Sequence, residues 1–369
     1  MRRFPAAYSV SAGVAATRAA AARPAWLERL RHRPALLFVV SVVALMLTVV
    51  VGVVFGNVTI PVTDTLAVLA NRLLGWPLDR SIPETTQTIV MELRLPRVFT
   101  AMAVGTALSL AGATFQGLLR NPLADPYVLG TASGAALGAA IAVLLPIQVA
   151  LLGLGLLHLF AFVGAITAVA VVYRMSRLGA LSSLTSVLLT GYAIGSLLAA
   201  GLAMTMYVSG SNLRQIFFYL LGSFSLASWQ QLAVGLPIIV IGSVLVLSRT
   251  RSLNALLLGE ETAAHLGIDV RRDRLILLAG ATLITAASVA VSGLIGFVGL
   301  VVPHLVRLLV GPNARLVLPL SATFGAAFLG LADVVARVPG ELPVGVVTAL
   351  LGAPFFLYLL RHYRTGYEL

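Results

Sequence analysis

Residues 249–274, RTRSLNALLLGEETAAHLGIDVRRDR, form a short polar segment with a long apolar run on each side. Inside it, residues 259–267 predict a two-turn helix. Glu260 and Glu261 lie at its N-terminus, where the helix dipole favours negative charge, and Gly267 lies where a left-handed residue would end it. Because arginines flank this helix on both sides, the segment predicts a surface that docks onto a cytoplasmic partner. An ordinary solvated loop with one helical turn is the alternative.

The composition indicates a polytopic membrane protein. Hydrophobic residues make up 59% of the 369 residues and charged residues only 10%, whereas a soluble domain carries about 25% charged residues. Cysteine is absent, which excludes disulfides, thiolate metal sites and a cysteine nucleophile. Lysine is absent too, so the chain has neither a Walker A loop nor Schiff-base chemistry. The net charge of +12 does not indicate nucleic-acid binding, because the arginines are scattered at the ends of apolar runs.

The apolar runs predict ten membrane-spanning helices. A helix needs about 20 apolar residues to cross about 30 Å of hydrocarbon. Three runs exceed one crossing, and each has a natural break: at 146–148, at Gly293 and Gly296, and at 333–343. The predicted spans lie within these runs: 36–56, 94–118, 127–173 (two spans), 184–208, 231–248, 275–311 (two spans) and 315–361 (two spans).

The arginines predict the orientation, because cytoplasmic loops carry an excess of them. With both termini in the cytoplasm, most of the 25 arginines and the 249–274 segment fall inside. The arginines left outside are Arg72, Arg80, Arg94, Arg97, Arg214 and Arg337. Residues 1–34 lack the apolar segment of a secretory signal. We expect them to form a disordered cytoplasmic tail, with the transmembrane domain at 35–369; a transit peptide is the less favoured interpretation.

Glycines recur at every fourth residue in two spans, at Gly130, Gly134 and Gly138 and at Gly191 and Gly195. Such rows allow helix backbones to approach closely. They favour helix packing within one subunit, with a transport pathway or a subunit interface as alternatives. A further alternative is an intramembrane hydrolase that pairs Ser133 with a histidine, His158 or His304, but no sequence pattern links these residues.

Ion-coupled transporters place acids or histidines within their spans. In this chain Asp125 falls in the predicted 119–126 loop, Asp333 falls at the outer end of a span, and His158 is the one ionisable group expected well inside a span. A transporter of this kind must therefore receive its energy from another subunit.

The chain resembles permease subunits of the BtuC/FecCD type, which belong to ABC importers for cobalamin, ferric siderophores and haem. The resemblance covers about 36–364. It is carried, in order, by LRLPR at 93–97, AGATFQGLLRNPLADPYVLG at 111–130, GEETAAHLG at 259–267, SGLIGFVGLVVPHLVR at 292–307, LADVVAR at 331–337 and ELPVGVVTALLGAPFF at 341–356.

This resemblance implies an all-α type II importer fold with ten spans in the bacterial inner membrane, with both termini cytoplasmic. It also implies a homodimer of permeases in contact with membrane lipid. Its partners would be two copies of an ABC ATPase and a periplasmic substrate-binding protein, with no nucleic acid. ATP and magnesium would bind the ATPase, so no cofactor is expected on this chain. The chain itself would not be an enzyme.

The resemblance also assigns roles to single residues. It places Glu260, Glu261, Ala264, His265, Leu266 and Gly267 on the coupling helix that enters a cleft of the ATPase. It places Asn121 and Leu123 at the cytoplasmic gate, with Ser183 and Leu184 at its second segment. Leu184 departs from the small hydroxyl residue common there. Arg94, Arg97 and Arg337 match arginines that receive acidic residues of the binding protein.

The expected function is import of a haem, a ferric siderophore or cobalamin by alternating access, in which the fifth and tenth spans open and close a central path. Haem or a siderophore is favoured over cobalamin only because such permeases are abundant in the family. The alternative is a secondary transporter or channel for a small solute.

Overall fold

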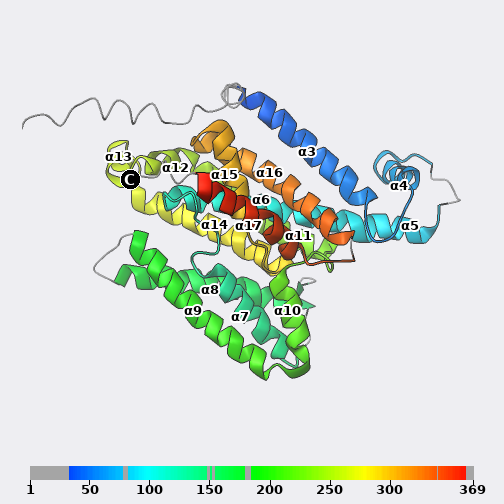
Figure 1. The fold of residues 1–369 in the computed structure, drawn as a ribbon, viewed down its shortest axis with the longest axis horizontal. Helices are drawn as coiled ribbons and strands as arrows, with labels where there is room; N and C mark the ends of the chain where they lie inside the picture. Colours follow the sequence, from blue (N-terminus) through cyan, green and yellow to red (C-terminus); the bar gives the residue numbers. More distant parts are fainter. Residues whose placement is uncertain are drawn as a thin grey trace, which may run out of the picture.

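A computed structural model describes residues 33–77, 82–147, 150–151, 154–178, 184–338 and 340–362. The structure is almost entirely helical (Figure 1). The first half of the chain forms α3 (Pro34–Val54), α4 (Val62–Leu74), α5 (Glu84–Thr88), the π-helical turn η1 (Ile89–Arg94), α6 (Leu95–Leu118), α7 (Thr131–Leu144), strands β1 (Ala150–Leu151) and β2 (Leu154–Gly155), α8 (Leu156–Leu178) and α9 (Leu184–Val208).

The second half continues with helices only. They are the 3-10 turn η2 (Gly210–Asn212), α10 (Leu213–Leu221), α11 (Trp229–Ser248), α12 (Thr250–Leu257), α13 (Glu260–His265), α14 (Val270–Ser292), α15 (Val298–Val310), α16 (Ala314–Arg337) and α17 (Val344–His362). Helices α12 and α13 lie at one end of the long helices, and α4 and α5 lie at the other (Figure 1). We call these the α13 end and the α4 end.

The predicted ten spans are confirmed in the described part of the chain. Seven helices are long and apolar enough to cross a membrane, and α7, α15 and α17 are shorter apolar helices. The three runs that were too long for one crossing all break near the expected positions. The first break falls between Leu144 and Leu156, which includes the expected 146–148, and the second falls at residues 293–297. The third falls between Arg337 and Val344, so it covers only the later part of the expected 333–343, because α16 continues past Asp333.

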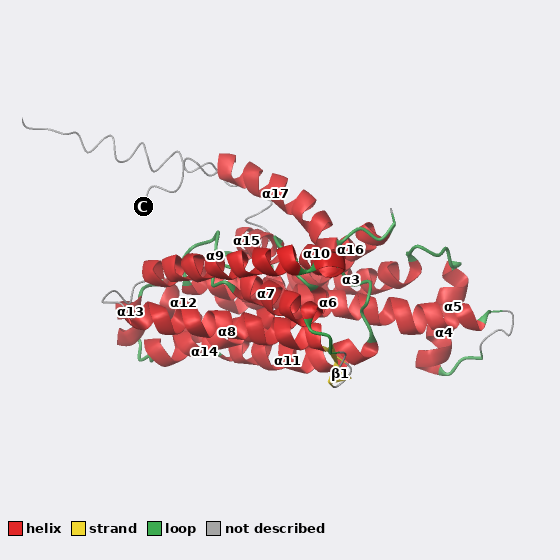
Figure 2. Cartoon of the chain, turned by 90° about the horizontal axis from the view of Figure 1, so that it is seen from below, coloured by secondary structure: helices red, strands yellow, loops and turns green. Residues whose placement is uncertain are grey.

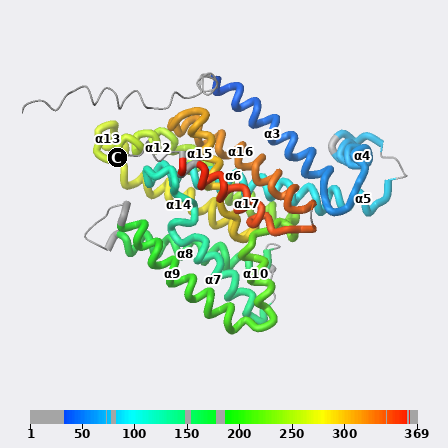
Figure 3. The backbone as a smooth tube through the Cα atoms, viewed as in Figure 1, coloured from blue at the N-terminus to red at the C-terminus, as the bar shows by residue number. Residues whose placement is uncertain are grey.

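Helix α6 is the centre of the structure. Of its 24 residues, 20 are buried, and it packs against α16, α14, α15, α11 and α3. Helices α3 and α9 lie at opposite edges of the tube trace, with α6 between them (Figure 3). Much of the surface of α9 is exposed, including Leu189, Leu197 and Met204, as expected for a helix that faces lipid or another subunit.

Glycines allow the central helices to touch through their backbones. A Cβ atom at Gly112 of α6 would overlap the carbonyl oxygen of Gly299, and one at Gly105 would overlap that of Gly325. The predicted glycine rows are used in the same way. Gly134 lies against Gly164 of α8, and Gly191 of α9 lies against the carbonyl of Val128. The rows therefore serve helix packing within the subunit.

Three details differ from the sequence-based expectation. The second span begins earlier, because the helical run that contains α6 starts at Glu84 and is 35 residues long. The segment before it contains an additional amphipathic helix, α4, which we did not predict. His158 is not deep inside a span. It is the third residue of α8, where its Nε2 lies 3.2 Å from Nε2 of Gln231.

The close backbone contact predicts a strong effect of one added methyl group. Gly112→Ala should destabilise the fold by about 3 kcal/mol, the upper part of the range for overpacked cores, because the overlapping atom is a backbone oxygen that cannot rotate away. The measurement is the thermal unfolding midpoint of the purified protein in detergent. Gly296→Ala is the control, since nothing lies within 4 Å of the Cβ position there. Equal midpoints for the two variants would contradict the assigned contact.

Candidate functional site

The predicted helix in the 249–274 segment is present as α13, and its end is well defined. Gly267 has φ +78. Its amide donates to the carbonyl of Ala264 at 2.9 Å, and the amide of Ile268 donates to that of Ala263 at 3.1 Å. This pair of bonds is a Schellman motif, which satisfies the last carbonyls of a helix. The predicted C-cap at Gly267 is therefore confirmed.

Most of α13 is exposed. Only Ala263 is buried, while Glu261, Ala264 and His265 face away from the protein. Glu260 is exposed as well, and forms an ion pair with Arg274. Leu258 and Leu266, on either side of the helix, are also largely exposed. An exposed helix flanked by exposed leucines is suited to contact a partner. The coupling role of these residues stays a prediction.

Helix α12 connects α13 to the membrane-spanning helices through polar contacts that the sequence did not reveal. Asp273, buried in the first turn of α14, accepts a hydrogen bond from Ser252 Oγ and pairs with Arg249 Nη1 at 3.4 Å. Asn254 Nδ2 donates to Asn313 Oδ1 at 3.0 Å, at the start of α16. In the sequence, Asp273 could have been singled out as an acidic residue that lies at the start of an apolar helix, next to several arginines.

The loop after α6 contains the predicted gate residues Asn121 and Leu123. Arg120 has φ +47, and the amide of Asn121 donates to the carbonyl of Gln116 at 3.1 Å, which ends α6. Asn121 Oδ1 then accepts the amide of Leu123 at 2.9 Å, and both side chains are exposed. Ser183 lies outside the described residues, and Leu184 is the first residue of α9, with its side chain outside the description. The gate assignment stays a prediction.

Gln116 is a further polar residue that the sequence did not single out. Pro303 has no amide hydrogen, so it leaves the carbonyl of Gly299 in α15 without its helical partner. Gln116 Nε2 donates to this carbonyl at 3.2 Å, while Gln116 Oε1 accepts from Arg307. Arg307 also donates to the carbonyl of Ala113 at 3.0 Å. The carbonyl that Pro303 leaves unpaired in α15 thus receives its hydrogen bond from a side chain of α6.

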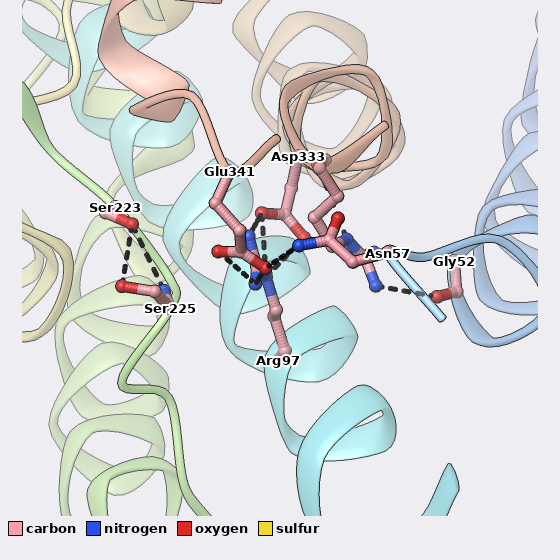
Figure 4. A network of polar contacts seen from close by, with 8 residues as sticks. Gly52, Asn57, Arg97, Ser223, Ser225, Asp333 and Glu341 are labelled. Carbon is pink, nitrogen blue, oxygen red and sulfur yellow. Dashed lines mark hydrogen bonds and ion pairs between the residues drawn. The ribbon is translucent and has the colours of Figure 1, made fainter. Parts of the chain in front are cut away.

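A second polar cluster lies at the α4 end, and we call it the arginine network (Figure 4). Asp333 of α16 is fully buried between two guanidinium groups, at 3.0 Å from Arg97 and 3.0 Å from Arg337. Arg97 also pairs with Glu341 at 3.0 Å, and Glu341 accepts from Asn57 at 3.0 Å. The arginine network therefore joins α6, α16, the loop before α17 and the loop after α3.

The arginine network also completes the C-terminus of α3. The last carbonyls of any helix lack intrahelical partners, and in a bilayer they cannot be left bare. Arg94 Nη1 donates to the carbonyls of Val53 and Val54, at 2.8 and 2.7 Å. Arg337 Nη1 donates to the carbonyl of Gly52 at 3.0 Å. The positive groups also match the negative end of the helix dipole.

The three arginines were expected to receive a binding protein, and the structure places them inside the subunit. Arg94, Arg97 and Arg337 are 5%, 8% and 2% exposed. Their hydrogen bonds and ion pairs are made within the chain. The docking role stays a prediction, but the geometry gives these residues a structural role that the sequence did not indicate.

An open cavity of about 1000 Å³ lies near the α4 end and is bordered by α7, α8, α10 and the end of α14. We call it the vestibule. The described residues that border it include Arg214 but no aspartate or glutamate, and its other polar groups include His158, Asn212, Gln215, Tyr219 and Ser225. Arg214 is exposed and lies 5.5 Å from the ring of Phe218. The vestibule is broad and weakly polar, and Arg214 is the one fully charged side chain among the described residues that line it.

The described residues hold no group of three or more aspartate, glutamate, histidine or cysteine side chains that could bind a metal ion. His158, one candidate for an intramembrane hydrolase, is paired with Gln231 at the start of α8. The described residues therefore offer a vestibule, a buried polar network and an exposed helix.

Comparison with known proteins decides the family. The model of the FecCD transport family matches residues 44–362. This chain belongs to the FecCD transport family. It is 46% identical to the cobalamin import system permease protein BtuC of Halobacterium salinarum over 77% of this chain and 76% of that protein. It is 42% identical to the hemin transport system permease protein HmuU of Yersinia pestis over 75% of this chain and 85% of that protein.

A solved structure supports the same fold. The chain is similar to a metal-chelate type ABC transporter in an inward-facing conformation, with a TM-score of 0.76 and 31% identity, over 89% of this chain and 99% of that chain. The expected type II importer fold is thereby confirmed. The FecCD family is one of ABC transporter permease subunits, which lack an ATPase site of their own.

The arginine network makes a prediction about Asp333. Asp333→Asn should destabilise the protein by about 3–5 kcal/mol, because it removes the carboxylate between two buried guanidinium groups while keeping the shape. The measurement is the thermal unfolding midpoint in detergent. Glu84→Gln, at an exposed carboxylate of the same end, is the matched control and should leave the midpoint unchanged. A midpoint for Asp333→Asn equal to that of the control would show that the network contributes little.

Proposed function

We propose that this chain is the permease subunit of an ATP-driven importer that moves an iron chelate, haem or a ferric siderophore, or cobalamin into the cytoplasm. It would pair with a second permease, bind two ABC ATPase subunits at the α13 end, and receive cargo from a periplasmic binding protein at the α4 end. In this arrangement it lies in the inner membrane with both termini in the cytoplasm, and ATP and magnesium bind only the ATPase.

The observation that carries this proposal is that α13 is exposed, while the adjacent α12 is hydrogen-bonded to two of the long helices. The helix extends beyond the spans and leaves nearly all of its side chains free, while α12 is bound to α14 and α16 through Ser252 and Asn254. A partner that moves α13 would therefore move the ends of two spans. The absence of lysine supports an outside source of energy, because this chain cannot form a Walker A loop.

The cargo proposal rests on the vestibule and on the relatives. Relatives carry the names of cobalamin and hemin permeases, so a large chelate is the cargo class. The vestibule has one arginine and no acid among its described residues, which suits a cargo with carboxylates better than a cationic one. This favours haem or an anionic ferric chelate over cobalamin. A secondary transporter or channel is the alternative, but no specific contact favours it.

The coupling prediction concerns two exposed residues of α13. Glu261→Arg combined with His265→Glu should abolish copurification of the ATPase subunit, because it reverses the charge pattern of the docking helix. The double variant should keep the thermal midpoint of the unaltered protein, since neither side chain is buried. Copurification is measured by affinity capture of the permease from detergent extracts.

Glu84→Arg is the matched control, because it reverses an exposed charge at the opposite end and should leave capture of the ATPase intact. Normal capture together with normal transport by the α13 double variant would contradict the coupling assignment.

The energy prediction concerns uptake by the complete transporter in proteoliposomes. Haemin, a ferric chelate and cobalamin are offered separately, each with its binding protein and with ATP on the ATPase side. Uptake of the cargo should require ATP and should persist when proton and sodium gradients are collapsed, because the described spans place no acid at mid-membrane depth for an ion relay. Uptake driven by a pH gradient without ATP would favour the secondary-transporter alternative.

A further inference from the structure

Helix α4 is an amphipathic helix that none of the roles above uses. On one side, Thr65 and Val68 are buried against a cluster that contains Val53 and Val90. On another side, Val62, Leu66 and Leu74 are 50%, 49% and 65% exposed. Their spacing of four and eight residues places them along one side of a helix. The helix therefore has an apolar row with no partner in the described chain.

The turn after α4 adds an exposed tryptophan at the end of this helix. Gly75 has φ +69 and ends the helix, with its amide donating to the carbonyl of Asn71 at 3.0 Å. Asn71 Nδ2 then donates to the carbonyl of Trp76 at 2.7 Å. These bonds hold Trp76 beside the end of the helix, where it is 63% exposed. We call Val62, Leu66, Leu74 and Trp76 the α4 row.

The position of α4 indicates what covers this row. Helix α4 runs across the direction of the long helices, so it lies roughly parallel to the membrane plane (Figures 1 and 2). It lies beside the end of α3, to which it is joined by residues 55–61. The middle of α3 exposes Val43, Met46 and Val50, as a lipid-facing helix does. The α4 row thus lies beside the end of a long apolar helix whose exposed side chains suit contact with lipid.

We propose that α4 is an in-plane membrane-surface helix, and that the α4 row contacts the phospholipid bilayer at the boundary between headgroups and acyl chains. Amphipathic helices bind this zone by burying their apolar side about 5–10 Å into it. Tryptophan is enriched there because its ring is apolar and its N–H is polar. The remaining polar side chains, which include Asp64 and Arg72, would stay in contact with water and headgroups.

The proposal does not depend on the cargo or on the direction of transport. In this proposal, α4 anchors the α4 end at the membrane surface. Val68 of α4 packs in the same cluster as Val53 of α3 and Val90 of η1, so a helix bound to the bilayer would also fix the ends of these elements. The alternative is that a soluble protein, instead of the bilayer, binds the α4 row. The bilayer is favoured because the row carries no charge and because α4 lies across the end of α3, whose exposed side chains are apolar.

The absence of cysteine allows a direct test with single spin labels. Leu66→Cys reports on the α4 row, Arg72→Cys is the control on the same helix, and Val43→Cys is the reference for lipid contact. The full chain is reconstituted in vesicles of phosphatidylcholine and phosphatidylglycerol. Collision rates of each label are measured with oxygen, which concentrates in the bilayer, and with a water-soluble nickel chelate. Each variant is first checked for an unchanged thermal midpoint.

The label at 66 should collide mainly with oxygen, as the label at 43 does, while the label at 72 should collide mainly with the nickel chelate. Equal nickel accessibility at 66 and 72 would overturn the proposal. So would a label at 66 that is open to nickel in the permease alone and becomes protected only when the binding protein is added. That second result would identify the row as a protein interface instead.

Discussion

The close contact of α6 with its neighbours is the constraint on which the rest of the structure depends. A helix surrounded by other helices in a bilayer gains no hydrophobic energy from leaving lipid, so it must gain from packing. Gly105 and Gly112 allow the backbones of α16 and α15 to touch α6 directly. At these two glycines no side chain lies between the helices. Larger apolar side chains of α6, such as Leu108, Leu110 and Phe115, are buried at other positions along the same helix.

Unpaired backbone carbonyls explain three of the buried polar residues, Arg94, Arg337 and Gln116. An unpaired polar group in hydrocarbon costs several kcal/mol. The end of α3 and the proline in α15 both create such groups, and Arg94, Arg337 and Gln116 satisfy them from other helices. Buried charges then require partners of opposite sign, which is the role of Asp333. The polar residues in LRLPR, LADVVAR and AGATFQ thus have structural reasons that are separate from any contact with a partner protein.

The sequence predicts the spans well and the polar contacts poorly. Hydropathy and length determine the ten apolar helices, and glycine and proline mark the breaks between them. The cap at Gly267 was also predictable, because helix ends depend on neighbouring residues. The partners of Arg97 were not, since Asp333 is 236 positions away and only the packing of α6 on α16 brings them together. The same holds for Ser252 with Asp273 and for Gln116 with Arg307. Helix α4 was missed because its apolar row is too short for a span and alternates with polar residues.

The two ends of α6 are held in different ways, and this difference suits the proposed mechanism. At the α4 end, the arginine network joins α3, α6 and α16 through buried charges, which resist separation. At the α13 end, α12 contacts α6 through Leu253 against Gly117 and α16 through two hydrogen bonds of Asn254. Asp273 of α14 accepts from Ser252 and pairs with Arg249, whose side chain is part-exposed. A part-exposed ion pair and neutral hydrogen bonds can exchange at lower cost than a carboxylate that is fully buried between two guanidinium groups. A partner that moves α13 would therefore shift the α13 ends of the spans while the α4 end stays closed around its ion pairs. Such a pivot is what alternating access requires of a permease whose energy comes from outside the chain.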